Sequence, residues 1–304
     1  MKAAAFQEFG EPEVLRETEL PTPDAAPGEV RVRVLAAGVQ PIDCAIRSGR
    51  RRPPGLEIVF PHVTGGEFAG VVDAVGQGVT DFRVGDQVLG FRTQWTYAQY
   101  TVVPTDQIVA KPASMPWDVA GGLSGAGQAA HTAVGALKVA AGETFLINGA
   151  AGGVGTIAVQ LARRCGATVI GTASEANHDY LRSLGAIPVT YGDGLADRIR
   201  DVAPNGVDAA LDAANEAGLK AALDLVQDPD RVGTIAAPEA AKKLGALWIG
   251  SQRSTERLTD LVNLYTEGGL RILVRATYPL ARAAEAHRNV ESGHGRGKVV
   301  LTLD

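Results

Sequence analysis

The pattern of apolar and polar positions divides the chain into two parts, and the first part consists of strands and turns. Val30, Val32 and Val34 alternate with polar residues, which is the period of a half-buried strand. Prolines and glycines separate this segment from its neighbours. Many short strands with such punctuation predict a compact, barrel-like β domain up to about residue 110. Further strands of this kind are expected at 67–76, 87–91 and 100–103.

From about residue 143 to 250 the pattern alternates between short apolar runs and helical spacing. The runs 144–147 and 167–172 read as strands buried on both faces, and the stretch between them places its apolar residues on one helix face. Strands that alternate with helices predict a parallel sheet. Ser254 is a suitable N-cap for a helix that ends at Gly268. The tail predicts a strand at 271–276, a helix at 280–290 and a strand at 298–303. This last strand could return to the first domain and make it discontinuous.

A glycine-rich turn, residues 148–155, joins the first buried strand to the first helix. Its spacing is Gly149-x-x-Gly152-x-x-Gly155. Glycines allow the backbone to turn sharply and to approach a pyrophosphate closely, and the free N–H groups of the helix start hold the anion. With a strand before it and a helix and strand after it, the turn predicts a dinucleotide-binding fold. The alternative interpretation is a purely structural glycine turn.

Composition narrows the function classes. The 304 residues suggest two domains, and 45% hydrophobic residues are enough for real cores. The net charge is −5, and residues 50–52 are the only tight arginine cluster, so a nucleic-acid partner is not expected. No segment approaches the roughly 20 apolar residues that span a bilayer, and the first residues become polar too early for a signal peptide. Cys44 and Cys165 are the only cysteines, with Cys165 expected on a core-facing helix surface. We therefore expect a reducing, cytoplasmic setting without disulfides.

Several stretches together resemble the medium-chain dehydrogenase/reductase superfamily and, within it, the zinc-independent quinone oxidoreductases. The stretches that carry the resemblance are 37–43, 47–49, 65–72, 84–88, 150–155 and 296–301. The resemblance implies an α/β protein with two domains and a cofactor cleft between them. The GroES-like β-barrel catalytic domain would comprise residues 1–115 and 270–304. The Rossmann domain, a doubly wound parallel sheet, would comprise 116–269.

The resemblance also implies the chemistry. NADPH would deliver hydride to a quinone or an enone, with Gln40 and Asp43 as catalytic positions. The Gln40 amide and backbone N–H groups would stabilise the developing oxyanion, and water would supply the proton. The positions that match the family's cofactor-binding residues are Thr132, Asn148, Ala150, Ala151, Gly152, Gly153, Val154, Gly155, Ser174, Tyr191, Ala237, Ile249 and Arg296.

Departures from the family pattern argue against a metal. Zinc alcohol dehydrogenases have a cysteine where this chain has Gln40, and a histidine where it has Gly66. With two cysteines and scattered histidines, no zinc ligand set can be assembled from nearby positions. We therefore expect no metal site and five ordinary histidines. These are His62, His131, His178, His287 and His294.

Residues near Gln40 also have simpler, structural interpretations. Asp43 and Arg47 are expected to form a structural ion pair. Cys44 is expected to be a small packing residue, because no neighbouring base would activate it. Ala45 occupies a position where the family often has a tyrosine, so it cannot contact substrate through a hydroxyl group.

Cofactor choice depends on the end of the second buried strand. Ser174 stands where an NAD-specific fold has a carboxylate, and it can donate to a 2′-phosphate. Tyr191 matches a position that flanks the same phosphate. Asn177 replaces a frequent lysine, for which Arg296 or His178 could compensate. NADPH is therefore the expected cofactor.

The expected assembly and two alternative functions complete this interpretation. A homodimer is expected through the strand at 247–249, because an open hydrophobic edge strand invites association. One alternative is an enoyl-thioester reductase of the same superfamily. The other is an NADPH-binding protein without turnover.

Overall fold

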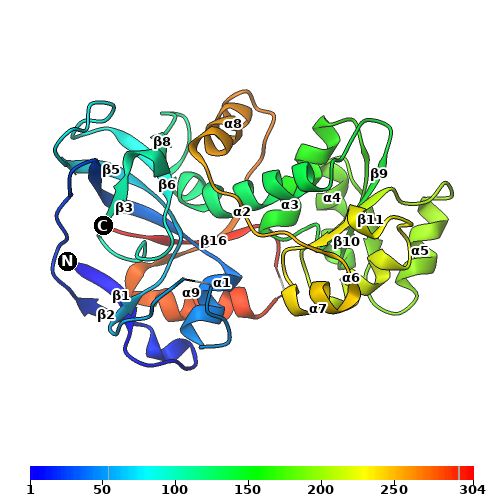
Figure 1. The fold of residues 1–304 in the computed structure, drawn as a ribbon, viewed down its shortest axis with the longest axis horizontal. Coiled ribbons are helices and arrows are strands. Elements are labelled where there is room, and N and C mark those ends of the chain that lie inside the picture. The colour runs from blue at the N-terminus through cyan, green and yellow to red at the C-terminus, as the bar shows by residue number, and fades with distance from the viewer. Residues whose placement is uncertain (54, 294) are drawn as a thin grey trace. The chain divides into compact units, whose positions relative to one another are not determined.

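The computed structural model describes residues 1–53, 55–293 and 295–304. Pro54, one of the prolines that separate the expected strands, and His294, expected to be an ordinary histidine, therefore lie outside the described residues. The chain forms two compact units (Figure 1). Unit 1 comprises Met1–Gly125, Arg253–Gly268 and Ile272–Asp304, and unit 2 comprises Ala126–Gln252 and Gly269–Arg271.

Unit 1 is built on a mainly antiparallel sheet of seven strands. Its path is β15-β16-β3-β5-β6-β8, and β7 also pairs with β3. The final strand of the chain, β16, pairs antiparallel with β3, with Val300 opposite Gly38. This confirms that the tail returns to the first part of the chain. The strands are β3 (Glu29–Val39), β5 (Glu67–Val75), β6 (Gln87–Phe91), β7 (Tyr100–Pro104), β8 (Ile108–Ala110), β15 (Val274–Pro279) and β16 (Lys298–Thr302).

A smaller sheet and three helices complete unit 1. The small sheet has the order β2-β1-β4. The alternating valines of β3 and the aromatic side chains of Phe6 and Phe68 are fully buried and belong to one apolar core, which also includes residues of the tail. The elements are β1 (Lys2–Phe6), β2 (Arg16–Glu19), β4 (His62–Val63), α1 (Pro41–Arg47), α8 (Thr255–Thr266), α9 (Ala283–Glu291) and the short 3-10 turns Pro12–Val14, Thr105–Gln107 and Leu280–Arg282.

Unit 2 is a six-stranded parallel sheet of the Rossmann type. Its order, β11-β10-β9-β12-β13-β14, reverses direction between β9 and β12, where ligands bind in doubly wound sheets. Figure 1 shows α3 on one side of this sheet and α6 and α7 on the other. The strands are β9 (Thr144–Asn148), β10 (Thr168–Ala173), β11 (Ile187–Thr190), β12 (Ala209–Asp212), β13 (Val232–Thr234) and β14 (Leu247–Trp248). The helices are α2 (Trp117–Ala136), which begins in unit 1, α3 (Gly153–Arg164), α4 (His178–Ser183), α5 (Leu195–Val202), α6 (Glu216–Leu223), α7 (Pro238–Leu244) and the 3-10 turns Glu175–Asn177 and Pro229–Arg231.

The observed units and the predicted domains differ chiefly in α8. The sequence assigned residues up to 269 to the dinucleotide-binding domain, whereas 253–268 belong to unit 1 because α8 packs against β8. The expected cap of this helix is present, since the Ser254 hydroxyl group accepts from the Arg257 N–H. One burial expectation was wrong: Cys165 is exposed. It follows the last turn of α3 as the C-cap, where the chain has already left the buried face.

Candidate functional site

The glycine turn of unit 2 has the geometry of a phosphate-binding loop. Gly149 has a φ of +75°, a conformation that glycine adopts without steric cost. The turn is tied to the end of β10, because the N–H of Gly149 donates to the Thr172 hydroxyl (3.1 Å) and the N–H of Ala150 donates to the Thr172 carbonyl (3.0 Å). These bonds fix the loop against the neighbouring strand.

The other two glycines of the turn, Gly152 and Gly155, have different steric surroundings. A Cβ at Gly155 would lie 2.3 Å from the carbonyl oxygen of Gly149, so this glycine allows α3 to pack closely on the turn. A Cβ at Gly152 would meet only that same oxygen, at 3.3 Å, and the φ of Gly152 is −69°. Gly152 is the N-cap of α3 and makes no side-chain cap, so the first N–H groups of the helix remain available to an anion. The turn therefore fits a dinucleotide pyrophosphate.

The ends of the central strands carry a buried polar network. The Asn148 amide donates to the Gly218 carbonyl (2.7 Å) and accepts from the Thr172 hydroxyl group (3.3 Å). Asp212 accepts from the Thr234 hydroxyl group at 2.6 Å, and burial raises the pKa of its carboxyl group. Asn148 is 2% exposed, so its side chain positions the loops around the turn.

The remaining predicted cofactor residues of unit 2 lie on several loops. The Thr132 hydroxyl group already donates to the Gln128 carbonyl (2.7 Å) and accepts from the Gln252 N–H (3.1 Å). Ser174 follows β10 and accepts from the Asn177 amide at 3.1 Å. Ala151, Gly153 and Val154 belong to the turn and first turn of α3, Tyr191 is exposed just past β11, Ala237 is the N-cap of α7, and Ile249 is buried just past β14. Arg296 is an exposed residue of unit 1. Their roles toward a cofactor stay predictions.

The two predicted catalytic residues lie in unit 1, at the end of β3. Gln40 immediately precedes α1, and its Nε2 donates to Glu67 Oε1 at 3.2 Å. The backbone N–H of Gln40 donates to Asp43 Oδ2 at 2.9 Å, which caps the helix. The structure therefore brings Gln40 and Asp43 together and gives both side chains defined positions.

Glu67 is the centre of this region, although the sequence interpretation gave it no role. Its side chain is fully buried, and Lys298 Nζ lies 2.7 Å from Oε1. Oε2 accepts from the backbone N–H of Gly125 at 2.7 Å. Glu67 and Lys298 are charged residues in otherwise apolar strands. That position was the signal in the sequence that could have identified both as functional candidates. We name Gln40, Asp43, Glu67, Tyr97 and Lys298 the unit 1 polar cluster.

Asp43 occupies the most constrained position of the cluster. It is 1% exposed, and its Oδ2 also accepts from the Tyr97 hydroxyl group at 2.9 Å. Its Oδ1 has no partner among the described residues. Burial raises the pKa of Asp43 to about 6, against the opposing effect of the hydrogen bonds from Tyr97 and Gln40. Burial also raises the pKa of Tyr97, so its hydroxyl group stays protonated.

The expected ion pair between Asp43 and Arg47 was wrong. Asp43 folds back onto the start of α1 as a cap, whereas Arg47, one turn later, pairs with Glu291 of α9 and donates to the Gly10 carbonyl (2.9 Å). The Asp43 carboxylate therefore caps the first turn of α1, and the Glu291 carboxylate pairs with the arginine in its last turn.

Cys44 and the histidines of unit 1 have structural surroundings. Cys44 is buried, its thiol contacts the His287 carbonyl at 3.8 Å, and burial raises the pKa of the thiol. The raised pKa disfavours a thiolate nucleophile. Burial lowers the pKa of His287 to about 3, and His62 bonds Gln94 at 3.3 Å. In the ranges 1–53, 55–293 and 295–304, no three His, Cys, Asp or Glu side chains gather as metal ligands.

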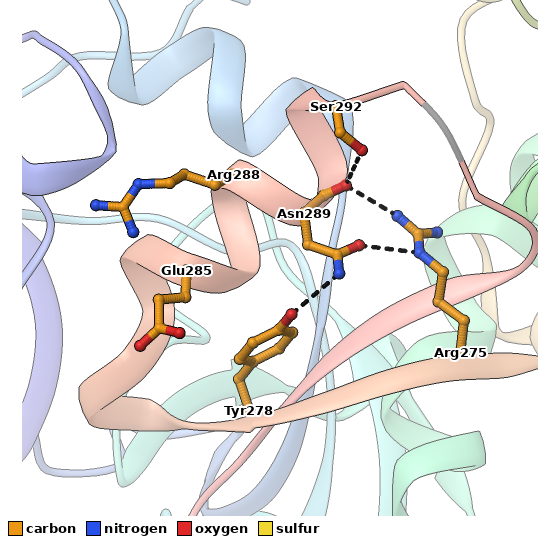
Figure 2. Close-up of a pocket in the computed structure, with 6 residues that line it drawn as sticks. All are labelled: Arg275, Tyr278, Glu285, Arg288, Asn289 and Ser292. Atoms are coloured by element: carbon orange, nitrogen blue, oxygen red, sulfur yellow. Dashed lines mark hydrogen bonds between the residues drawn. The ribbon is translucent and has the colours of Figure 1, made fainter.

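A surface hollow of about 490 Å³ lies apart from the cluster, between α9 and β15 (Figure 2). Arg275 donates to Asn289 Oδ1 (3.0 Å), and the Asn289 amide donates to the Tyr278 hydroxyl group (3.0 Å). These hydrogen bonds hold the polar side chains that line the hollow to one another.

A parallel sheet with a pyrophosphate-binding turn, joined to a β unit with a buried polar cluster, defines a two-domain protein of the dinucleotide-dependent dehydrogenase class. Comparisons agree with this class: residues 26–113 match the alcohol dehydrogenase GroES-like domain, and residues 184–301 match the zinc-binding dehydrogenase family. The chain belongs to the medium-chain dehydrogenase/reductase superfamily, in its quinone oxidoreductase branch.

Relatives cover the whole chain or nearly all of it. It is 30% identical to a quinone oxidoreductase of Sus scrofa, over 100% of this chain and 98% of the relative. It is 33% identical to a pikromycin polyketide synthase component of Streptomyces venezuelae, over 94% of this chain but 8% of that protein. Among solved structures, a quinone oxidoreductase of Coxiella burnetii has a TM-score of 0.87 at 31% identity, covering 100% of this chain and 99% of that one. A mycobacterial protein complexed with NADPH has a TM-score of 0.88 at 29% identity, covering 99% and 100%. Among the described helices, none is long and apolar enough to cross a membrane.

The raised pKa of Asp43 makes stability depend on pH. The ordinary value is 3.8 and the folded value is about 6, so the folded state holds this proton more tightly than the unfolded state does. The resulting stabilisation is complete below pH 4 and is lost as the pH rises through 6. Asp43→Asn removes this titration. The unfolding free energy of the parent, relative to this variant, should therefore fall by up to about 3 kcal/mol between pH 4 and pH 7.

Urea unfolding at several pH values measures this difference. Asp106→Asn, at an exposed carboxylate of the same unit, controls for the loss of one negative charge. A difference between parent and Asp43→Asn that does not vary with pH would show that Asp43 does not titrate in this range.

Proposed function

We propose that this protein is an NADPH-dependent, zinc-independent reductase of quinones or α,β-unsaturated carbonyl compounds. The observation that carries the proposal is the turn at Gly149, Gly152 and Gly155, whose backbone leaves room for a pyrophosphate at the start of α3. The names of the relatives support the reaction class, and the mycobacterial structure with NADPH supports the cofactor.

The residues of unit 2 bind and orient the cofactor. The N–H groups at the start of α3 hold the pyrophosphate, and the Asn148 network fixes the surrounding loops. Bound NADPH supplies hydride. The chain's own task is then to hold the reactants in position and to exclude water.

Within the unit 1 polar cluster, the Gln40 amide acts on the substrate carbonyl. Hydride addition to the β-carbon places negative charge on that oxygen, and one well-placed donor contributes about 3–4 kcal/mol to the transition state in other enzymes. Glu67 accepts one N–H of the Gln40 amide and thereby orients the other for the oxygen. Water supplies the proton to the α-carbon.

Zinc independence follows from the donor set. The positions of the zinc ligands in alcohol dehydrogenases carry an amide at Gln40 and no side chain at Gly66. Neither offers the thiolate or imidazole that zinc prefers. The description of the matching zinc-binding dehydrogenase family applies to that family as a whole.

NADPH oxidation by a panel of quinones, enones and enoyl thioesters, with and without a strong chelator, tests the function. Turnover of quinones or enones that survives chelation is the expected result. Preference for thioesters would favour the enoyl-thioester alternative, which the similarity to a polyketide synthase component supports. NADPH binding without any turnover, or activity lost together with one tightly held zinc, would overturn the proposal.

Gly152→Val should abolish NADPH binding while the protein stays folded. Gly152 has an ordinary φ, and its Cβ would meet one atom within 4 Å, the Gly149 carbonyl oxygen at 3.3 Å, so a shift of a few tenths of an ångström should accommodate a side chain. That side chain would occupy the pyrophosphate's space. Titration of nucleotide fluorescence measures binding. Gly155→Ala is the contrast, since its Cβ would lie 2.3 Å from the Gly149 carbonyl and should destabilise the turn itself. Unchanged affinity in Gly152→Val would refute the assignment of the turn.

Ser174→Asp should reverse the cofactor preference. In the parent we expect NADPH to be preferred over NADH by about tenfold in kcat/KM, or about 1.4 kcal/mol. Ser174 follows β10 and can donate to a 2′-phosphate, whereas an aspartate would repel it and bind the ribose hydroxyl group of NADH. Steady-state kinetics with both cofactors measure the ratio. Ser174→Ala separates loss of the hydroxyl group from added charge, and an unchanged ratio in Ser174→Asp would exclude Ser174 as the discriminating residue.

A homodimer through β14 is part of the proposal. This strand is the edge of the unit 2 sheet, and Trp248 on it is 42% exposed. Light scattering at micromolar concentration should give twice the chain mass, and Trp248→Lys should shift the protein toward monomer. A monomeric parent would contradict this assembly.

The proposed setting is the cytoplasm, with a small molecule as substrate and with neither nucleic acid nor membrane as partner. Both cysteines are free thiols, which supports a reducing compartment. Cell fractionation tests the location.

A further inference from the structure

Arg253 is a fixed, half-buried cation at the start of the segment that carries α8. Its Nη1 donates to two backbone carbonyls, those of Arg92 (2.8 Å) and Gly66 (3.2 Å). Its guanidinium carbon lies 5.4 Å from the centroid of the Phe91 ring. Two hydrogen bonds and a cation–π contact hold the head group in one place.

The charge of Arg253 has no direct counter-ion. No carboxylate of the described residues lies within ion-pair distance of it, whereas Arg47 has Glu291 and Lys298 has Glu67. The carboxylates whose charges act on it, Glu67 and Asp43, are already bonded within the unit 1 polar cluster. Burial lowers the pKa of Arg253, yet an arginine keeps its proton at any working pH.

Gly66 lies directly beside the guanidinium group and accepts one of its hydrogen bonds. A Cβ at this position would lie 3.3 Å from the Arg92 carbonyl and 3.7 Å from Arg253 Nη1. The next residue, Glu67, is the one that orients the Gln40 amide. Arg253 and the Gln40 side chain are therefore anchored to adjacent residues of the same strand start. Nη1 is occupied, but Nη2 and Nε have no hydrogen-bond partner among the described residues.

We propose that Arg253 is a catalytic residue whose guanidinium group binds the substrate's carbonyl oxygen and stabilises the negative charge that hydride addition places on it. This inference rests on the proposed function and deepens it. Arg253 supplies a positive charge at this oxygen, and the Gln40 amide supplies a neutral donor. A fixed, desolvated cation stabilises such a charge far more than one in water does.

The substrate class follows from this chemistry. A carbonyl oxygen that becomes an enolate or hydroquinone oxyanion gains from Arg253 in the transition state, so the charge raises kcat more than it lowers KM. An enone or quinone meets this requirement, and substrates whose carbonyl accepts more charge should depend more strongly on Arg253.

The kinetic test compares Arg253→Met and Arg253→Lys with the parent. Methionine keeps an apolar stem over Phe91 but removes the charge, and we expect kcat to fall by about 100-fold or more, with a much smaller change in KM. Lysine keeps the charge without the planar fork and should retain an intermediate kcat. Arg257→Met, four residues further along the chain in the first turn of α8, is the matched control and should keep the parental kcat.

Chemical rescue separates catalysis from a structural role. In Arg253→Ala, added guanidinium ion at millimolar concentration should restore part of kcat, whereas the same concentration of sodium ion should not. Guanidinium ion should not stimulate the parent or Arg257→Met. If Arg253 only ties α8 to the Gly66 and Arg92 carbonyls, its substitution should lower the thermal stability and leave the kcat of the folded fraction unchanged.

An equilibrium probe makes the inference independent of turnover. 4-Nitrophenol, bound to the protein with NADP⁺, presents a stable phenolate oxygen in place of the oxyanion. Its absorbance should show ionisation at a lower pH in the complex with parent than in water, and this shift should be lost in Arg253→Met but kept in Arg257→Met.

The outcomes distinguish the two proposals. If the substrate panel shows no reduction but the phenolate shift depends on Arg253, the proposed function fails and the anion site stands. If quinones or enones are reduced and Arg253→Met keeps parental kcat and the parental phenolate shift, the function stands and the role of Arg253 is refuted.

Discussion

The buried carboxylate of Glu67 is the interaction on which unit 1 depends. It joins four distant parts of the chain: its own strand β5, Gln40 at the end of β3, Gly125 in α2 and Lys298 at the start of β16. A buried ion pair adds little stability over an apolar replacement, but removal of one partner costs about 3–5 kcal/mol because a charge is left unpaired. Glu67 therefore fixes which segments meet, and the Gln40 amide takes its orientation from that arrangement.

The Glu67 carboxylate and the Gln40 amide fill the space beside two glycines, so larger residues do not fit there. A Cβ at Gly38 would lie 2.1 Å from Glu67 Oε1, and a Cβ at Gly125 would lie 1.9 Å from Gln40 Nε2. A glycine inside a helix costs roughly 1 kcal/mol relative to alanine, so Gly125 in α2 carries an energetic penalty that the polar contacts offset. Its N–H, donated to Glu67, is part of the same arrangement.

The sequence could predict what local pattern determines. The glycine turn, the alternation of strands and helices in unit 2 and the Ser254 cap all depend on residues within a few positions of one another. The cluster could not be predicted in this way, because Glu67 and Lys298 are 231 residues apart and no periodicity pairs them. The same limit explains the wrong partner assigned to Asp43: proximity in α1 suggested Arg47, whereas tertiary packing supplied Tyr97 and gave Arg47 to Glu291.

Glu67 and Asp43 show two solutions to carboxylate burial within one site. Glu67 receives a cation, Lys298, and two neutral donors. Asp43 receives only neutral donors, the Tyr97 hydroxyl group and the Gln40 N–H, and its pKa rises to about 6. The negative charges of both carboxylates act on Arg253, and the effect of Glu67 is the larger. Protonation of Asp43 below about pH 6 removes one of these two negative charges, whereas Glu67 keeps its ion pair with Lys298.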